Sequence, residues 1–388
     1  MPKNSPDISD INSHAAAEAQ LSVVAAEDPV AAAAPRRVLI ARFSAFGDVA
    51  MTVPVIYSAC RCHPATSFVL VTRRSMVGIF VNKPTNLIIE GVDIAMHKGF
   101  RGLWRLTADI VKRHGGFDAF LDLHGVLRTR VMALYCRLHG IRVCTINKGR
   151  AHRRALTRRS NKVMLPLLSQ RSRYREVFFS ARLPLTWRFD GLYGRDGKAL
   201  AEDYAAIAPR KRVSEQWIGI APFAAHKGKI YPPELMYKVV EKLCARPDTR
   251  VFLLGAGGTE QQQLDEWAAC LPAATSLAGK HYGFAAELAL MSHFDCALTM
   301  DSANMHLAAI AGAKVVSIWG ATHPYCGFKA WRQNESNLIG VPLACRPCSV
   351  FGDKPCYRGD YICLSAIRPD LIYNKIIENL NNNNATDK

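Results

Sequence analysis

The sequence lacks any long uninterrupted hydrophobic run. No stretch of about 18 apolar residues occurs in the 388 residues, and the most apolar region of the C-terminal half, 297–321, is broken by Asp301, Asn304, His306 and Lys314. A helix needs about 20 mostly apolar residues to cross a bilayer. We therefore expect no transmembrane helix.

The amino-terminal region also lacks the features of a secretory signal. Its only lysine or arginine before residue 35 is Lys3, and Glu18, Glu27 and Asp28 interrupt its alanine stretch. A signal peptide has a basic start and an unbroken apolar segment, so we expect a cytoplasmic protein. Residues 1–34 contain few large apolar side chains, which predicts a flexible tail because little burial can offset the entropy of ordering.

Acidic residues are scarce, most of all between Lys98 and Arg175. The whole chain has 50 Lys and Arg against 32 Asp and Glu, a net charge of +18, and this stretch holds 19 Lys and Arg against three acids, a local net of +16. Such density predicts a surface for an anionic partner. Nucleic-acid surfaces interleave aromatic side chains with cations, yet Tyr174 is the only aromatic residue in 148–175. We therefore expect no nucleic-acid partner.

Twelve cysteines are present, and in a reducing compartment they are expected to be free thiols or metal ligands. Four of them, Cys345, Cys348, Cys356 and Cys363, lie in the segment CRPCSVFGDKPCYRGDYIC. The two-residue step of the first pair suits a zinc site, whereas the later spacings are wider than in a zinc ribbon. A structural zinc and a set of buried thiols remain alternative interpretations, and neither has a catalytic role.

What the sequence does contain is an alternation of short β-branched runs with longer amphipathic stretches. The first series is RVLIAR, SFVLVT, NLIIEG, FDAFLDL and IRVCTI, and the second is WIGIAP, RVFLLG, TSLAG, CALTM and KVVSIWG. Helical patterns separate these runs, the first of them reaching about Cys60. Between the two series, residues 148–210 lose the rhythm and become rich in Arg, Leu and Pro. The pattern predicts an α/β protein with two doubly wound parallel sheets.

These patterns also predict domain boundaries. After the tail at 1–34, we expect a first domain at 35–185 that includes the basic segment and a second domain at 186–388. We expect the terminal helix to pack back on the first domain.

Asp48 follows the first predicted strand, in ARFSAFGDV. Ligands of open α/β sheets collect at the carboxyl ends of the strands. Gly47 gives the turn its freedom, and Asp48 then stands at a helix N-terminus. Local sequence leaves two interpretations open: Asp48 caps the helix, or it accepts a proton in a cleft.

A second strand end carries DLHGVLRTR, with Asp122, His124 and Arg128. These residues either form a turn and a solvated helix start or contact a ligand in the same cleft as Asp48.

In the second half, APFAAHKGKIYPPELM places Lys227 and Lys229 in the loop after a strand. They are either phosphate-binding point charges or ordinary surface lysines. In TMDSANMHLAAIAG, a strand runs into Asp301 and Ser302, and a helix with His306 follows. The free N–H groups there predict an anion site that suits a diphosphate, and we expect Asp301 to accept hydrogen bonds from the turn amides.

The segment LLGAGGTEQQQ resembles a dinucleotide fingerprint only weakly. Glu260 stands where the third glycine of G-x-G-x-x-G belongs, and the strand is not the first of its domain. We interpret Glu260 as an acceptor for a nucleoside hydroxyl or, alternatively, as a residue that stabilises the helix start.

Taken together, RFSAFGDV, DLHGVLR, KIYPPEL, LLGAGG and MDSANMHLAA…AKVVSIWGATHP resemble the ADP-heptose:lipopolysaccharide heptosyltransferases, glycosyltransferase family nine, over roughly residues 36–370. The resemblance implies a GT-B fold, in which two Rossmann-like domains face each other across a cleft. It implies that Asp48 is the catalytic base and that Lys229 binds the donor phosphate. The turn from Asp301 to His306 then binds the diphosphate through Ser302, Ala303 and Asn304 as well. Ala303 stands where the family usually has glycine.

The resemblance also implies a reaction and its partners. The enzyme would move a heptose from a nucleotide-diphosphate donor, ADP-heptose, to the inner core of lipopolysaccharide with inversion. Lys229 and the helix N-terminus would stabilise the leaving group, so no metal cofactor is needed. The basic first domain would bind phosphorylated lipid A and inner core at the cytoplasmic face of the inner membrane, as a monomer. The acceptor side would comprise Gly47, His124, Arg128, Lys148 and Arg150. A GT-B nucleotide-sugar epimerase and a basic nucleic-acid-binding protein remain the alternatives.

Overall fold

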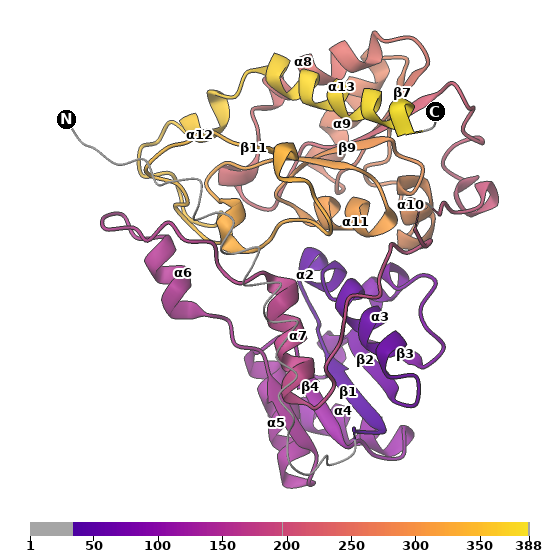
Figure 1. Ribbon diagram of the computed structural model, residues 1–388, viewed down its shortest axis with the longest axis vertical. Helices are drawn as coiled ribbons and strands as arrows, with labels where there is room; N and C mark the ends of the chain where they lie inside the picture. The colour runs from indigo at the N-terminus through magenta and orange to yellow at the C-terminus, as the bar shows by residue number, and fades with distance from the viewer. Residues whose placement is uncertain (1–33, 196, 387–388) are drawn as a thin grey trace.

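The computed structural model describes residues 34–195 and 197–386 of the chain. These residues form two lobes stacked along the long axis of the molecule, each a parallel sheet flanked by helices (Figure 1). The predicted α/β class and the two parallel sheets are confirmed. The flexible tail predicted at 1–34 lies almost wholly outside the described residues.

The first sheet has five parallel strands in the order β3-β2-β1-β4-β5. Its strands are β1 (Arg37–Ala41), β2 (Ser67–Arg73), β3 (Leu87–Val92), β4 (Ala119–Asp122) and β5 (Arg142–Thr145). All five coincide with the predicted β-branched runs. β1 lies in the centre, with Ala41 beside Val71 of β2 and Asp122 of β4, so the loops after β1 and β4 emerge next to each other.

The helices of the first lobe differ from the prediction at the first turn after β1. Where one helix was expected up to Cys60, the structure has α2 (Phe46–Ala50) and α3 (Val53–Cys62). Pro54 lies in the first turn of α3 and has no N–H to donate to Ala50, which separates the two helices. The other helices of this part are η1 (Arg74–Ile79), η2 (Ile94–Met96), α4 (Gly99–Arg113) and α5 (Leu127–Leu138).

The basic segment contains two helices that the sequence pattern did not predict, α6 (Arg150–Leu156) and α7 (Gln170–Ser180). Ser169 caps α7 by accepting a hydrogen bond from the amide of Ser172. Tyr174 and Phe178 bury the helix in the first lobe. The many arginines of this segment made the short apolar face of α7 difficult to recognise from the sequence pattern. In Figure 1, α6 projects sideways beside the junction of the lobes.

The second sheet has six strands in the order β11-β10-β9-β6-β7-β8. Its strands are β6 (Gln216–Ala221), β7 (Thr249–Leu253), β8 (Ala274–Ser276), β9 (Cys296–Met300), β10 (Val315–Ile318) and β11 (Leu338–Ile339). The first five match predicted runs, and the two-residue β11 was not foreseen. The helices and 3-10 turns of this lobe are η3 (Ala201–Tyr204), η4 (Lys227–Lys229), α8 (Pro233–Cys244), α9 (Thr259–Cys270), α10 (Phe284–Met291), α11 (Ala303–Ala311), η5 (Pro324–Cys326), η6 (Glu335–Asn337), α12 (Ile362–Ser365) and α13 (Pro369–Thr386).

The terminal helix α13 does not follow the expectation that it packs back on the first domain. It lies against α8 and β9 at the far end of the second lobe (Figure 1). Its apolar stripe, Ile372, Ile376 and Leu380, is almost fully buried in the core of that lobe. Because this stripe already has a hydrophobic partner there, the helix has no apolar face left for the first lobe.

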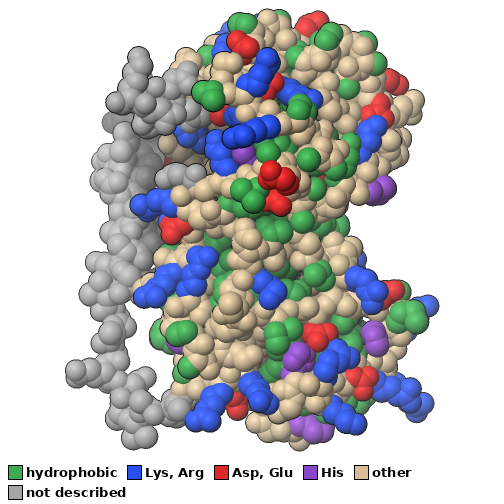
Figure 2. Space-filling model, turned by 90° about the vertical axis from the view of Figure 1, so that its right-hand side faces the viewer, with side chains coloured by type: hydrophobic (Ala, Val, Ile, Leu, Met, Phe, Trp, Pro, Cys, Tyr) green, Lys and Arg blue, Asp and Glu red, His purple; other side chains and the backbone are tan. Residues whose placement is uncertain are grey.

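The lobes touch through α2 and α11, which pack against each other. Figure 2 shows them meeting at a narrower waist, with Lys and Arg side chains spread over the visible face of both. Within residues 34–195 and 197–386, no helix is long and apolar enough to cross a membrane.

Candidate active site

The carboxylate of Asp48 lies just after β1, in the first turn of α2, and is held by Arg42. The Arg42 Nη2 atom is 2.5 Å from Asp48 Oδ2, and the Ala45 amide also reaches Oδ2 at 3.4 Å. Arg42 is itself fixed, because its Nη1 donates to the carbonyl of Leu123 at 2.7 Å. No hydrogen bond from the described part of the chain reaches Oδ1. One oxygen of the carboxylate is therefore anchored while the other is available.

Gly47 lies against α11 of the second lobe. A Cβ atom placed on Gly47 would lie 3.0 Å from His306 Cδ2 and 3.4 Å from the Cα atom of Ala303, both in α11. A side chain at this position would press on α11, and the neighbouring atoms would have to shift to admit it. The glycine next to Asp48 thus sets the distance between the carboxylate and the N-terminus of α11.

Asp48 opens onto a cavity of about 520 Å³ whose walls come from both lobes. Of the predicted acceptor residues, His124, Lys148 and Arg150 line this cavity. Its full lining also includes the cations Arg42, Arg153, Arg154 and Lys354, with Asp353 as a second carboxylate. The cavity is therefore strongly cationic around one acidic side chain of the first lobe, which suits an anionic ligand.

The three predicted residues of the segment after β4, Asp122, His124 and Arg128, do not lie together in one cavity. Asp122 is fully buried, and its Oδ1 accepts hydrogen bonds from the amides of His124 and Gly125 at 2.9 and 2.7 Å, so it holds the turn. Burial raises the pKa of Asp122. His124 faces the Asp48 cavity, with its Nε2 3.5 Å from Ser44 Oγ. Burial and the nearby Arg42 lower the pKa of His124 to about 3, so it is neutral near pH 7. Arg128 lies outside this cavity, in a neighbouring groove.

In the second lobe, Lys229 and Asp301 form a largely buried ion pair. Lys229 Nζ is 3.0 Å from Asp301 Oδ2, so the carboxylate has a lysine partner in place of the expected turn amides. The stem of Lys229 passes beneath Gly352, where a Cβ atom would lie 2.5 Å from Lys229 Cγ. Lys227 instead lies over the ring of Tyr361, with 5.3 Å between Nζ and the ring centroid. The two lysines therefore have different surroundings, and Lys229 is the one that reaches Asp301 at the end of β9.

The N-terminus of α11 carries two buried polar atoms without a partner in the described residues, Ser302 Oγ and His306 Nδ1. Burial, together with Arg171 and Lys229, lowers the pKa of His306 to about 3. The ring is therefore neutral at pH 7 and able to donate one hydrogen bond. Ala303 is the first residue of the helix, and Asn304 follows it. Alanine adopts the helical backbone conformation as easily as glycine does. Free helix amides and unpartnered side-chain atoms together form a suitable anion site.

Glu260 lies in the first turn of α9, near the loop after β7. Its Oε2 accepts a hydrogen bond from the amide of Ala256 at 2.8 Å. This contact matches the helix-start interpretation, and the nucleoside contact stays a prediction.

The four-cysteine segment covers the Lys229 loop, and Arg346 fixes it there. The guanidinium of Arg346 is buried and donates to the carbonyls of Gly320, Trp319 and Thr322 at 2.6, 2.7 and 3.1 Å. All four thiols are free: Cys345, Cys348, Cys356 and Cys363. Across residues 34–195 and 197–386, no three His, Cys, Asp or Glu side chains are grouped so that they could share a metal ion. The structural zinc therefore stays a prediction.

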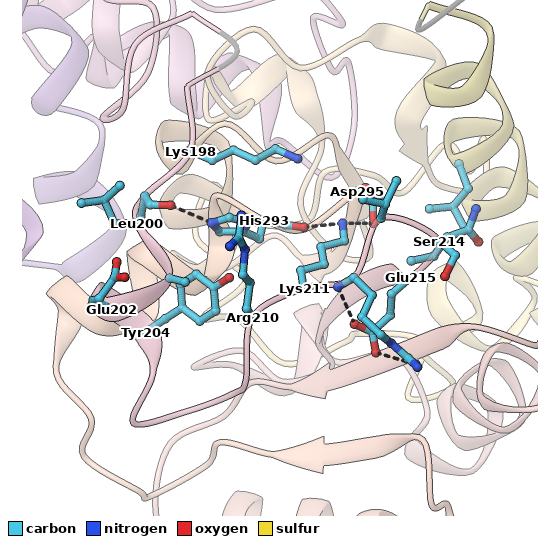
Figure 3. A pocket seen from close by; sticks show the side chains of 16 residues that line it. Lys198, Leu200, Glu202, Tyr204, Arg210, Lys211, Ser214, Glu215, His293 and Asp295 are labelled. Atoms are coloured by element: carbon cyan, nitrogen blue, oxygen red, sulfur yellow. Dashed lines mark hydrogen bonds and ion pairs between the residues drawn. The ribbon is translucent and has the colours of Figure 1, made fainter.

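Another hollow, of about 840 Å³, lies near the amino ends of β6 and β9, away from the carboxyl ends that carry Lys229 and Asp301 (Figure 3). Asp295 lines it immediately before β9, whereas Asp301 follows the same strand. Lys211 spans this hollow's wall, with its Nζ 2.5 Å from Asp295 Oδ2 and 2.9 Å from the carbonyl of His293. None of the residues predicted from sequence as site residues lines it.

Several residues of the Asp48 cavity were not predicted from the sequence, among them Arg42, Arg153 and Lys354. Arg42 precedes the motif around Asp48, Arg153 lies in the undifferentiated basic segment, and Lys354 belongs to the cysteine segment. The position of Arg42 at the end of β1 was a usable signal. Nothing in the local sequence separates Arg153 from its many arginine neighbours or brings Lys354 to the first lobe.

The two Rossmann-like lobes, with a carboxylate of one opposite a helix N-terminus of the other, define a GT-B fold. A GT-B likeness is found in solved structures that cover most of the chain. The glycosyl transferase family 9 structure from Veillonella parvula has 15% identity and a TM-score of 0.68, covering 89% of this chain and 97% of that one. The E. coli ADP-heptose lps heptosyltransferase II has 15% identity and a TM-score of 0.64, covering 90% and 99%. The structure of the E. coli heptosyltransferase WaaC with ADP has 17% identity and a TM-score of 0.58, and the match covers 88% of this chain and 99% of that one.

The sequence profile of glycosyltransferase family 9 (heptosyltransferase) matches residues 111–355, and the chain belongs to this family. A curated relative, lipooligosaccharide heptosyltransferase 2 of Campylobacter jejuni, is 32% identical over 88 residues, which is 23% of this chain and 25% of the relative. The same enzyme of a second C. jejuni strain is 28% identical over 82 residues, 21% of this chain and 25% of that protein. The chain thus spans about a quarter of the length of the curated relatives it matches.

Proposed function

We propose that this protein is an inverting heptosyltransferase that moves a heptose from ADP-heptose to the inner core of lipopolysaccharide, with Asp48 as the general base. The observation that carries the proposal is the place of Asp48. Its carboxylate opens onto a cationic cavity with walls from both lobes, and the adjacent Gly47 lies against the N-terminus of α11. The acceptor would reach the carboxylate from the cavity, and the donor diphosphate would lie at α11.

The chemistry requires one proton transfer and one displacement. The acceptor hydroxyl gives its proton to Asp48 as its oxygen attacks the anomeric carbon of the heptose, and the bond from that carbon to the diphosphate oxygen breaks. Attack from the face opposite the diphosphate inverts the configuration. Arg42 anchors the carboxylate through Oδ2, so Oδ1 is the oxygen that takes the proton.

The negative charge that develops on the leaving diphosphate has two stabilising groups nearby. The free amides at the start of α11 and the ammonium of Lys229 provide hydrogen bonds and positive charge there. Lys229 is paired with Asp301, so donor binding would shift part of its interaction to phosphate. Ser302 Oγ and the neutral ring of His306 supply further hydrogen bonds. No step of this mechanism is routed through a metal.

Two observations support the substrate classes. The cationic lining of the Asp48 cavity suits a phosphorylated, acidic acceptor such as lipid A with its inner core, reached at the cytoplasmic face of the inner membrane. For the donor, the solved structure of WaaC, which has the same fold, is described with ADP, and another with an ADP-2-deoxy-2-fluoro heptose.

The proposal is tested by incubating the full-length protein with ADP-heptose and a heptose-free inner-core acceptor and identifying the product by mass spectrometry. We expect the acceptor mass to rise by one heptose residue, and thermal shifts with ADP to exceed those with UDP, GDP and CMP. Release of free sugar or an epimerised donor with no change in the acceptor would contradict the transferase assignment.

A further inference from the structure

A groove of about 1030 Å³ lies beside the Asp48 cavity, on the first lobe. It runs between the start of α4 and the start of α5, at the same carboxyl edge of the sheet as Asp48. Val126 lines the Asp48 cavity, and the next residue, Leu127, lines the groove. The start of α5 therefore separates the two hollows, and a molecule that extends past it would enter both.

Large apolar side chains are exposed along this groove. Leu127 is 77% exposed and Phe100 is 54% exposed, although both line the groove, and Met96 beside them is 78% exposed. Phe100 stacks on Trp104, with 5.4 Å between ring centroids. An exposed cluster of this kind, with an aromatic row behind it, marks an interaction surface.

Cations surround the apolar cluster. Arg73, Arg74, Lys98 and Arg128 line the groove, and within the described chain none of them has an ion pair with an acidic side chain. The acid in the lining, Asp93, accepts a hydrogen bond from the amide of Ala95. Exposed apolar side chains within a ring of unpaired cations match the interface of an anionic bilayer, where apolar groups enter the headgroup layer and cations meet lipid phosphates.

We infer that this groove is the face by which the enzyme docks on an anionic membrane, with Phe100 and Leu127 inserted and Arg74 and Lys98 at the phosphates. The inference rests on the proposed function only in making the acceptor a lipid. A lipid headgroup held at this face would pass the start of α5 and reach Asp48 without leaving the bilayer. The cations Lys148, Arg150, Arg153 and Arg154 of the arginine-rich segment, by contrast, line the Asp48 cavity.

The inference is tested by sedimentation of the full-length protein with phosphatidylcholine vesicles that contain either no anionic lipid or about 30% phosphatidylglycerol. We expect binding to the anionic vesicles only. The Phe100→Ser/Leu127→Ser and Arg74→Glu/Lys98→Glu variants should each weaken it by at least about tenfold, and the wild-type binding should fall as salt rises.

Matched controls lie on the second lobe. Leu200 and Val213 are 69% and 107% exposed, and Lys238 is an exposed cation, so Leu200→Ser/Val213→Ser and Lys238→Glu should bind as the wild type does. The kcat for a deacylated, water-soluble acceptor should be unchanged in the groove variants, which separates loss of docking from loss of catalysis. Unaltered vesicle binding in both groove variants, or equal binding to vesicles without anionic lipid, would overturn the inference whether or not the enzyme is a transferase.

Discussion

Gly47 and His306 are in direct apposition across the two lobes: a Cβ atom on Gly47 would come to 3.0 Å from His306 Cδ2. This contact joins the turn that carries the proposed base to the helix start that holds the proposed diphosphate site. The distance between the proposed base and the proposed diphosphate site therefore depends on the absence of a side chain at Gly47.

Side chains of increasing size at Gly47 should progressively move Asp48 away from the start of α11. Gly47→Ala makes a contact tighter than packed Cβ atoms usually have, and Gly47→Val adds further volume, so we expect kcat to fall several-fold and then at least about a hundredfold, because small misplacements are costly for reacting groups. Steady-state kinetics with thermal unfolding as a folding control measures this. A Gly47→Val enzyme with wild-type kcat would show that the contact does not position the site.

Removing the carboxylate of Asp48 should abolish chemistry while leaving donor binding intact. We expect Asp48→Asn to lower kcat by about a thousandfold, since a general base contributes roughly 10²–10⁴, and to change the ADP-heptose Kd by less than about threefold. Asp353 lines the same cavity and accepts a hydrogen bond from Ser349, so Asp353→Asn is the matched control and should keep most of the activity. If both variants lose activity equally, Asp48 has no special role.

The two lysines of the loop after β6 should differ in their effect on the donor. Lys229→Ala should weaken ADP binding at least about tenfold, because a phosphate contact is lost, whereas Lys227→Ala should change it by less than about threefold. Isothermal titration with ADP measures both. Lys229→Ala also leaves the Asp301 carboxylate without its partner, which would destabilise the fold. The double variant Lys229→Ala/Asp301→Asn removes that unpaired charge, so a loss of ADP binding that persists in it comes from the lost phosphate contact. The reverse order of the two lysines would assign the phosphate to Lys227.

Stability should fall as the pH is lowered, in part because of His124 and His306. Burial, and in second place nearby cations, lower the pKa of each from 6.5 to about 3. Between these values the unfolded chain binds protons that the folded chain does not. The free energy of unfolding therefore carries no penalty from these histidines above about pH 6.5. As the pH falls from there toward 3, it decreases by about 1.4 kcal/mol per pH unit for each histidine.

This dependence is measured by urea unfolding at about pH 7 and pH 5. His124→Asn should lose less stability than the wild type between the two pH values, and His152→Asn, at an exposed position, should lose as much as the wild type. Equal losses in all three proteins would show that His124 is not kept neutral by the fold.

The sequence predicted ten of the strands and the residues at their ends because strands and their polar termini are local features. Of the residues it assigned to the acceptor, His124, Lys148 and Arg150 line one cavity with Asp48 and Arg128 lies in the neighbouring groove. Their contact with an acceptor stays a prediction. It missed the pairing of Lys229 with Asp301, since the two belong to different loops that meet only when β6 and β9 lie side by side. It misplaced α13 for the same reason: an apolar stripe shows that a helix packs, but not on which partner.

The basic segment of the first lobe is tied to the cysteine segment of the second. Lys162 Nζ donates to the carbonyls of Cys345 and Pro347 at 2.7 and 3.0 Å, and Arg153 lies over the rings of Phe328 and Phe351. The Asp48 cavity consequently has one wall on each lobe. A rotation of one lobe against the other would therefore change the volume of the cavity, and a ligand that contacts both walls would favour one relative orientation of the lobes.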